Sequence, residues 1–95
     1  MKQFQNDLIR RSYLKITYDV VVSAICPVDG LPDRYDAEIH STAVIPVESI
    51  LEVVSKISGK KMFQEDLTQE LARAIGARII TVGYHSGVKT TCECS

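Results

Sequence analysis

The spacing of hydrophobic residues predicts a chain of two strands, two helices and two further strands. Alternation of apolar and polar residues, typical of half-buried strands, covers residues 12–25, 35–45 and 77–94. Apolar residues instead recur every three or four positions over residues 47–58 and 63–75, which predicts two amphipathic helices. In the third strand the apolar positions are Ile80, Val82 and Tyr84.

Turn-forming residues separate these segments. Residues 26–34 contain Pro27, the pair Asp29-Gly30 and the pair Pro32-Asp33, and Pro46 is expected to end the second strand because it has no donor for a ladder. Gly59 and Gly76 stand where helix C-terminal caps are expected. The sequence His85-Ser86-Gly87 predicts the turn that divides the last two strands.

This order predicts an α+β fold, ββααββ, with a four-stranded antiparallel sheet and two antiparallel helices on one face. We expect an N-terminal segment at residues 1–11 and a single domain at residues 12–95. A chain of 95 residues buries only about two thirds of its unfolded surface, and the sheet has two free edges. We therefore expect a homo-oligomer in which the edges join into a closed barrel.

Composition narrows the partners and the compartment. Eleven basic residues against twelve acidic ones give a net charge of −1, which lacks the electrostatic footprint of nucleic-acid or anionic-lipid binding. The sequence has no apolar segment of signal-peptide or membrane-spanning length, so we expect a cytoplasmic protein without a membrane partner. Its three cysteines favour free thiols, catalysis or metal binding over disulfides.

The best functional lead is Cys26, which leaves the first strand and is followed seven positions later by Asp33. A thiol needs a neighbour that moves a proton before it works as a nucleophile, and the short loop between them can hold the two together. The alternative is a packed cysteine and an ordinary turn aspartate, since both are common.

Three motifs resemble a known family in their order and separation: CPVDGLPD at residues 26–33, VES at residues 47–49 and FQED at residues 63–66. They resemble the tunnelling-fold enzymes, whose ββααββ protomers form barrels and bind purine- or pterin-like rings between subunits. Within that family the sequence is most similar to the QueF-type nitrile reductases of the queuosine pathway. The same match includes their shorter archaeal relatives, the QueF-like amidinotransferases of archaeosine synthesis, a tRNA modification.

The resemblance implies a role for each matching residue. Cys26 matches the nucleophile that attacks the nitrile of 7-cyano-7-deazaguanine to form a thioimide, and Asp33 matches the proton donor. Glu65 matches the carboxylate that binds the ring's N–H and amino groups, and Gln64 replaces a histidine beside it. Three residues match a further part of the substrate pocket: Val47, Glu48 and Ser49.

Departures from the family pattern favour the amidinotransferase, in which ammonia adds to the thioimide and no cofactor is needed. The reductases follow the ES pair with lysines that hold NADPH phosphates, whereas Ile50 and Leu51 stand there and the first lysine is Lys56. The Arg-Gly-Gly turn of the reductases is His85-Ser86-Gly87 here. The sequence leaves open whether the base is free or in nucleic acid.

Three alternatives remain open. One is an NADPH-dependent 7-cyano-7-deazaguanine reductase, and another is a non-catalytic oligomeric binding module. The third resembles the zinc-dependent GTP cyclohydrolases, in which a Gln-Glu pair also opens the second helix, as Gln64 and Glu65 do. Its candidate zinc ligands would come from Cys26, Cys92, Cys94, His40 and His85, although both histidines are better explained as solvated strand or turn residues.

Overall fold

The computed structural model describes residues 14–95 and has the predicted element order. The strands and helices are β1 (Ile16–Ile25), β2 (Pro32–Ser41), α2 (Val47–Ile57), α3 (Gln64–Ile75), β3 (Arg78–His85) and β4 (Val88–Cys94). The expected N-terminal segment, residues 1–11, lies outside the described residues. The prediction of a ββααββ chain is confirmed.

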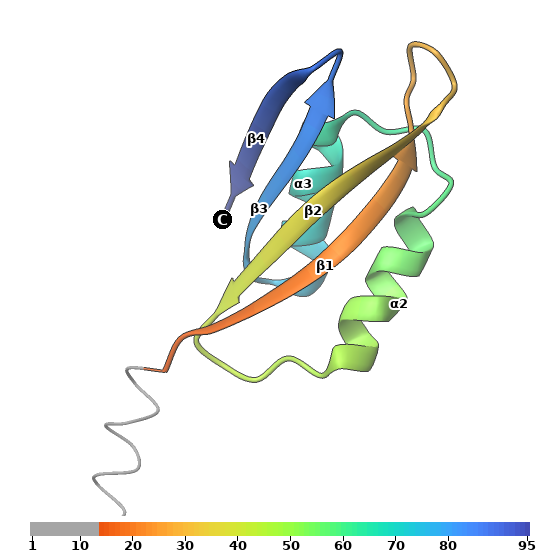
Figure 1. The fold of residues 1–95 in the computed structure, drawn as a ribbon. Coiled ribbons are helices and arrows are strands. Elements are labelled where there is room, and N and C mark those ends of the chain that lie inside the picture. The colour runs from red at the N-terminus through yellow and green to blue at the C-terminus, as the bar shows by residue number, and fades with distance from the viewer. Residues whose placement is uncertain (1–13) are drawn as a thin grey trace, which may run out of the picture.

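The four strands form one antiparallel sheet in the order β1-β2-β3-β4, so that β1 and β4 are its edges. Both helices cover the same face of this sheet and run in opposite directions (Figure 1). Helix α2 packs on β1, and α3 packs on β3 and β4. Among residues 14–95, no helix is long and apolar enough to cross a membrane.

The core lies between the sheet and the helix layer. The predicted inward face of β1 is confirmed, because Val22 and Ala24 are buried and Tyr18 and Val20 pack against the core. The alternation over residues 12–25 also places Leu14 on that face, but Leu14 precedes β1 and is 42% exposed. The other buried apolar residues are Tyr35, Ala37, Ile39, Ile50, Ile57, Leu67, Leu71, Ala72 and Ile79.

The expected apolar face of β3 is wrong. Strand β3 turns Ile79, Thr81 and Gly83 toward the helices, whereas Tyr84 is exposed on the opposite face. Thr81 is tolerated in the core because its hydroxyl oxygen lies 2.6 Å from the Thr68 hydroxyl oxygen of α3. Periodicity alone cannot reveal such a partner, since it lies on another element.

Strand β2 is displaced from the expected 35–45. It begins earlier, because Pro32 pairs with Ile25 and keeps the first position of the strand, where no donor is required. It ends at Ser41, whose hydroxyl accepts a hydrogen bond from the Ala43 backbone N–H at 3.0 Å. That local bond replaces the ladder at the end of the strand.

Two residues of the expected apolar stripe on α2 do not reach the core. Ile50 and Ile57 are buried, but Val47 and Leu51 are 54% and 53% exposed in the single chain. The two exposed residues are four positions apart and therefore share one outer face of the helix.

Gly83 leaves room for the side chain of Tyr35 from the neighbouring strand β2, and this contact generates a prediction for stability. A Cβ atom at Gly83 would lie 2.5 Å from Cδ1 of the buried Tyr35 ring. We expect Gly83→Ala to lower the free energy of unfolding by about 1–3 kcal/mol, because the ring must move within a packed layer. Urea unfolding of the purified protein measures this loss.

The matched control is the same substitution in a Tyr35→Leu background. The cost of Gly83→Ala should be smaller there, because the ring that clashes is gone. An equal cost in both backgrounds would show that the ring is not the cause.

Candidate functional site

Two backbone hydrogen bonds, here called the clip, join Ile25 at the end of β1 to Lys60 and Met62 in the segment between the helices. The clip positions the candidate nucleophile. The backbone N–H of Ile25 donates to the Lys60 carbonyl at 2.8 Å, and the Met62 N–H donates to the Ile25 carbonyl at 3.1 Å. Ile25 and Lys61 thus form an isolated parallel bridge. The residue after this bridge on β1 is Cys26, so the clip holds the thiol beside the start of α3.

The loop after Cys26 is closed by its own hydrogen bonds. The Cys26 N–H donates to the Leu31 carbonyl at 2.8 Å, and the Gly30 N–H donates to the Cys26 carbonyl at 2.9 Å. Asp29 accepts from the Leu31 N–H at 2.9 Å. The chain then enters β2, where Asp33 pairs with Ala24. The loop therefore returns Asp33 to the same end of the sheet as Cys26.

The two residues border one hollow of about 210 Å³, together with the first residues of α3 and the end of β3. Its lining residues are Cys26, Pro27, Val28, Asp33, Tyr35, Met62, Phe63, Gln64, Glu65 and His85. Drug-sized ligands occupy pockets of about 300–1,000 Å³, so a hollow of this size in one chain suits a single fused ring. Four of the seven candidate site residues, Cys26, Asp33, Gln64 and Glu65, meet here.

The buried Tyr35 forms part of the wall of this hollow and contacts Asp33. Its hydroxyl donates to Asp33 Oδ2 at 3.2 Å, and its ring centre lies 5.9 Å from that of His85. Burial raises the pKa of Tyr35 well above its usual value, and the negative charge and hydrogen bond of Asp33 add to the effect. Tyr35 is therefore a neutral donor to Asp33 at physiological pH.

Gln64 is the polar centre beneath the hollow and is only 1% exposed. Its amide nitrogen donates to the Thr90 carbonyl at 3.0 Å and to the Thr81 carbonyl at 3.2 Å. Its amide oxygen lies 3.0 Å from His85 Nε2. The side chain thus connects α3, β3 and β4, and it presents His85 to the hollow.

Glu65 stands beside Gln64 in the first turn of α3, where the helix dipole favours a carboxylate. It is exposed, and it borders both the hollow beside Cys26 and a second hollow that contains Cys92 and Cys94. Burial raises the pKa of the Cys92 thiol, and the charge of Glu65 raises it further. The Cys92 thiol is accordingly less easily ionised to the reactive thiolate.

The structure does not bring Val47, Glu48 and Ser49 to this hollow within one chain. They open α2 just after Ile45, whose N–H donates to the Tyr18 hydroxyl at 3.0 Å. Tyr18 precedes the clip by seven strand residues, or about 23 Å at about 3.3 Å per residue. The three residues therefore lie near the opposite end of the sheet.

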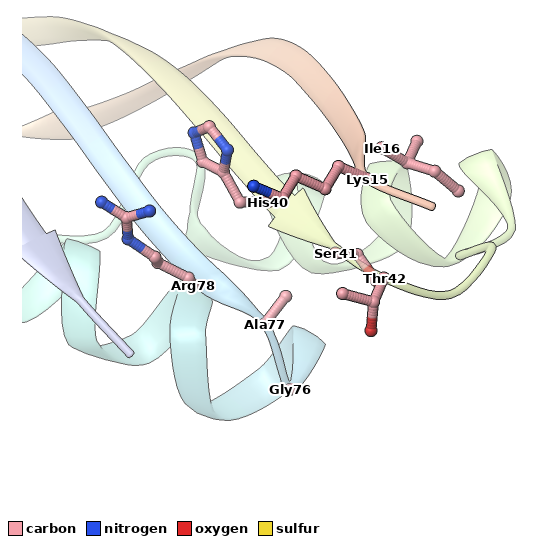
Figure 2. Close-up of a pocket in the computed structure, with 8 residues that line it drawn as sticks. All are labelled: Lys15, Ile16, His40, Ser41, Thr42, Gly76, Ala77 and Arg78. Carbon is pink, nitrogen blue, oxygen red and sulfur yellow. The ribbon is translucent and has the colours of Figure 1, made fainter. Parts of the chain in front are cut away.

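A larger hollow of about 430 Å³ lies at that opposite end (Figure 2). Its polar side chains include Lys15, His40 and Arg78, but Glu93 pairs with Arg78, and Glu38 lies 2.9 Å from His40. Among residues 14–95, neither a thiol nor a carboxylate lines it, so the smaller hollow is the better candidate for chemistry despite its size.

The candidate zinc ligands are spread over three places. All three cysteines are free thiols. Cys26 and His85 border the first hollow, Cys92 and Cys94 border the second, and His40 borders the third. Within residues 14–95, no group of three or more Cys, His, Asp or Glu side chains could hold a metal ion. The donor set of one chain does not fit a zinc centre, and we derive no step through zinc.

Comparison with known proteins identifies the fold. No family model matches the chain, and no curated protein matches its sequence. Among solved structures, the chain is similar to the crystal structure of the archaeosine synthase QueF-Like in the apo form. The TM-score is 0.74 at 17% sequence identity, over 84% of this chain and 90% of that one. The chain has the tunnelling fold.

The expected resemblance to QueF-like enzymes is thereby confirmed at the level of the fold. The tunnelling fold places the hollow at the hairpin end of the sheet, where the β1–β2 loop meets the start of α3. Sequence reasoning missed two of its polar residues. The sequence pattern places Tyr35 only at the start of a strand, and it predicts a solvated turn residue at His85, which is instead half-buried at the wall.

The raised pKa of Tyr35 predicts a pH-dependent contribution to stability. Tyrosine ordinarily titrates near pH 10, and a raised folded pKa means that ionisation is disfavoured in the folded state. The stability that Tyr35 supplies is therefore complete below about pH 10 and is lost as the pH rises above it.

We expect Tyr35→Phe to lower the free energy of unfolding by about 1–2 kcal/mol near neutral pH, because the bond to Asp33 is lost. The difference from wild type should shrink between about pH 9 and pH 11. Urea unfolding across this range measures it, with Tyr84→Phe, an exposed tyrosine, as the control. A difference that stays constant with pH would contradict the assignment.

Proposed function

We propose that this protein is an enzyme that acts on the nitrile of 7-cyano-7-deazaguanine through a thioimide on Cys26 and releases an amidine by addition of ammonia. The observation that carries the proposal is the meeting of Cys26, Asp33 and Glu65 at one hollow of a QueF-Like fold. In this proposal Cys26 is the nucleophile, Asp33 is the acid and Glu65 is the carboxylate that binds the ring.

The first step forms one bond and moves one proton. The Cys26 sulfur attacks the electrophilic nitrile carbon, a C–S bond forms and the C≡N bond becomes C=N. The nitrogen that gains electron density takes a proton, and the thiol loses one. Asp33 carries this proton from sulfur to nitrogen, and Tyr35 orients the Asp33 carboxylate through its hydroxyl.

Glu65 selects the ring. A carboxylate accepts two hydrogen bonds side by side, and the deazaguanine edge offers a ring N–H next to an exocyclic amino group. Glu65 stands at the start of α3, one residue after the buried Gln64, so its backbone is held rigidly in place. Base recognition therefore needs no positively charged surface.

Helix α2 supports amidine formation over reduction. A reductase of this type holds the phosphates of NADPH with lysines, but Ile50 is buried in the core. Lys56, the first lysine on the helix, is four residues beyond Glu52 and pairs with it at 3.2 Å. Among residues 14–95, the positions next to Glu48 and Ser49 offer no free cation for a dinucleotide.

The pocket is completed by a second copy of the chain. Val47, Glu48 and Ser49 are exposed and far from Cys26 in their own chain, so they reach a Cys26 hollow only from a neighbouring subunit. Val47 and Leu51 give that end of α2 an apolar surface for such a contact. We infer a homo-oligomer with its active sites between subunits.

Incubation with 7-cyano-7-deazaguanine should add the mass of one intact ligand per chain and produce a near-ultraviolet thioimide absorbance. Cys26→Ala should abolish both signals, because no other thiol borders the hollow. Intact-protein mass spectrometry and absorbance spectroscopy measure the two effects.

Cys94→Ala is the matched control, since Cys94 lies outside this hollow and should leave the adduct unchanged. An adduct that persists in Cys26→Ala would contradict the assigned nucleophile. The failure of wild type to form any adduct would contradict the proposed substrate.

The missing phosphate-binding lysines predict that NADPH is not consumed. With the nitrile substrate and ammonium present, the amidine product should accumulate while the absorbance of added NADPH stays constant. Product mass spectrometry and absorbance at the nicotinamide band check this. Loss of NADPH linked to turnover would instead assign the protein to the reductases.

A further inference from the structure

The hydrogen bonds around Gln64 have only one consistent set of directions. Two of its neighbours on one side are the backbone carbonyls of Thr81 and Thr90, at 3.2 and 3.0 Å, and a carbonyl can only accept. The amide nitrogen of Gln64 must therefore face them, and the amide oxygen faces His85.

Hydrogen bonds of Thr68 and Thr81 support this orientation of the Gln64 amide. The Thr68 hydroxyl donates to the Gln64 backbone carbonyl at 2.7 Å, so its proton is committed there. In the 2.6 Å contact between the two hydroxyls, Thr81 must then be the donor. The Thr81 oxygen is left as an acceptor toward the Gln64 amide at 3.2 Å. The donor and the acceptor of each hydrogen bond in this network are therefore fixed.

This order determines which nitrogen of His85 carries the proton. Because the Gln64 oxygen can only accept, the His85 Nε2 atom 3.0 Å away must donate. Neutral His85 is then the Nε2–H tautomer, and its Nδ1 atom is a free acceptor. Within residues 14–95, no hydrogen bond is made to that nitrogen.

His85 borders the hollow that holds Cys26, and it is the only imidazole there. The titratable groups that share the hollow are Cys26, Asp33, Tyr35 and Glu65. Asp33 is assigned to the proton transfer of the first step and accepts from the Tyr35 hydroxyl, and Glu65 is the proposed ring ligand. The second half of the reaction needs a proton acceptor for the incoming nitrogen, and His85 is the remaining group suited to it.

We propose that Gln64 is a positioning residue that holds His85 in the Nε2–H tautomer, so that His85 Nδ1 accepts the proton lost by ammonia when it adds to the Cys26 thioimide. This inference rests on the proposed function. It explains how the chain works with Gln64 in place of a histidine, since the imidazole stands on β3 instead of α3.

The step balances. The ammonia nitrogen forms a C–N bond to the thioimide carbon and gives one proton to His85 Nδ1. The C–S bond then breaks, the electron pair leaves with the Cys26 sulfur, and the imidazolium returns its proton to that thiolate. Nitrile plus ammonia thus becomes amidine, the thiol is regenerated, and Gln64 accepts from Nε2 in both protonation states.

The tautomer can be observed directly, because the chain has only two histidines. Long-range proton–nitrogen spectra of labelled protein at about pH 8, where imidazole is ordinarily neutral, distinguish the protonated from the bare ring nitrogen. His40→Gln assigns the remaining signals to His85. We expect Nε2–H in wild type and a mixture of tautomers in Gln64→Met. Nδ1–H in wild type would overturn the proposal.

The kinetic test separates the two halves of the reaction. With preformed adduct, addition of ammonium should release product about 100-fold or more slowly in His85→Asn, and about tenfold more slowly in Gln64→Met. Adduct formation should slow far less than product release in His85→Asn, and His40→Gln, outside the hollow, should match wild type in both steps. If Gln64→Met does not fold, His85→Asn and the wild-type spectrum still decide.

The outcomes distinguish this inference from the function on which it rests. Normal adduct with wild-type release in His85→Asn would overturn the role of His85 alone. Absence of adduct in wild type would overturn the proposed function, and the assigned step with it.

Discussion

The buried amide of Gln64 is the interaction on which the rest of the site depends. It is nearly inaccessible to solvent, yet it satisfies carbonyls on two strands and the imidazole of His85. An unpaired buried amide would be costly, so helix α3 can dock on β3 and β4 only in the position where all these bonds form. The same docking sets the place of Glu65, the next residue along the helix.

Two local constraints complete the hollow above this amide. The absence of a side chain at Gly83 lets the Tyr35 ring lie across β3, where its hydroxyl reaches Asp33. The bridge between Ile25 and Lys61 ties the end of β1 to the segment that leads into α3. Each constraint links elements that are distant in sequence, and together they gather a thiol, a carboxylate and an imidazole at one wall.

Among residues 14–95, several surfaces of the single chain have no partner. The edge strands β1 and β4 are open, the outer face of α2 carries Val47 and Leu51, and the Val47–Ser49 segment lies at the end opposite Cys26. A subunit contact that covers these surfaces would supply the missing part of the pocket. In the proposed function, the same subunit contact would cover the sheet edges and complete the substrate pocket.

The amino-acid sequence by itself determined the element order, the end of α3 at Gly76, and the short loop that brings Cys26 and Asp33 to one end of the sheet, because each depends on neighbours close along the chain. Helix α2 instead ends at Ile57 with Ser58 as its cap, one residue before the expected Gly59. The sequence did not determine which face of β3 is buried, since Thr81 is accepted in the core only through Thr68 on α3. Nor did it reveal that Tyr35 and His85 border the hollow, because their partners Gly83 and Gln64 come from other elements. Periodicity records the average polarity of a face, whereas a buried polar group is decided by the one partner that the tertiary structure brings to it.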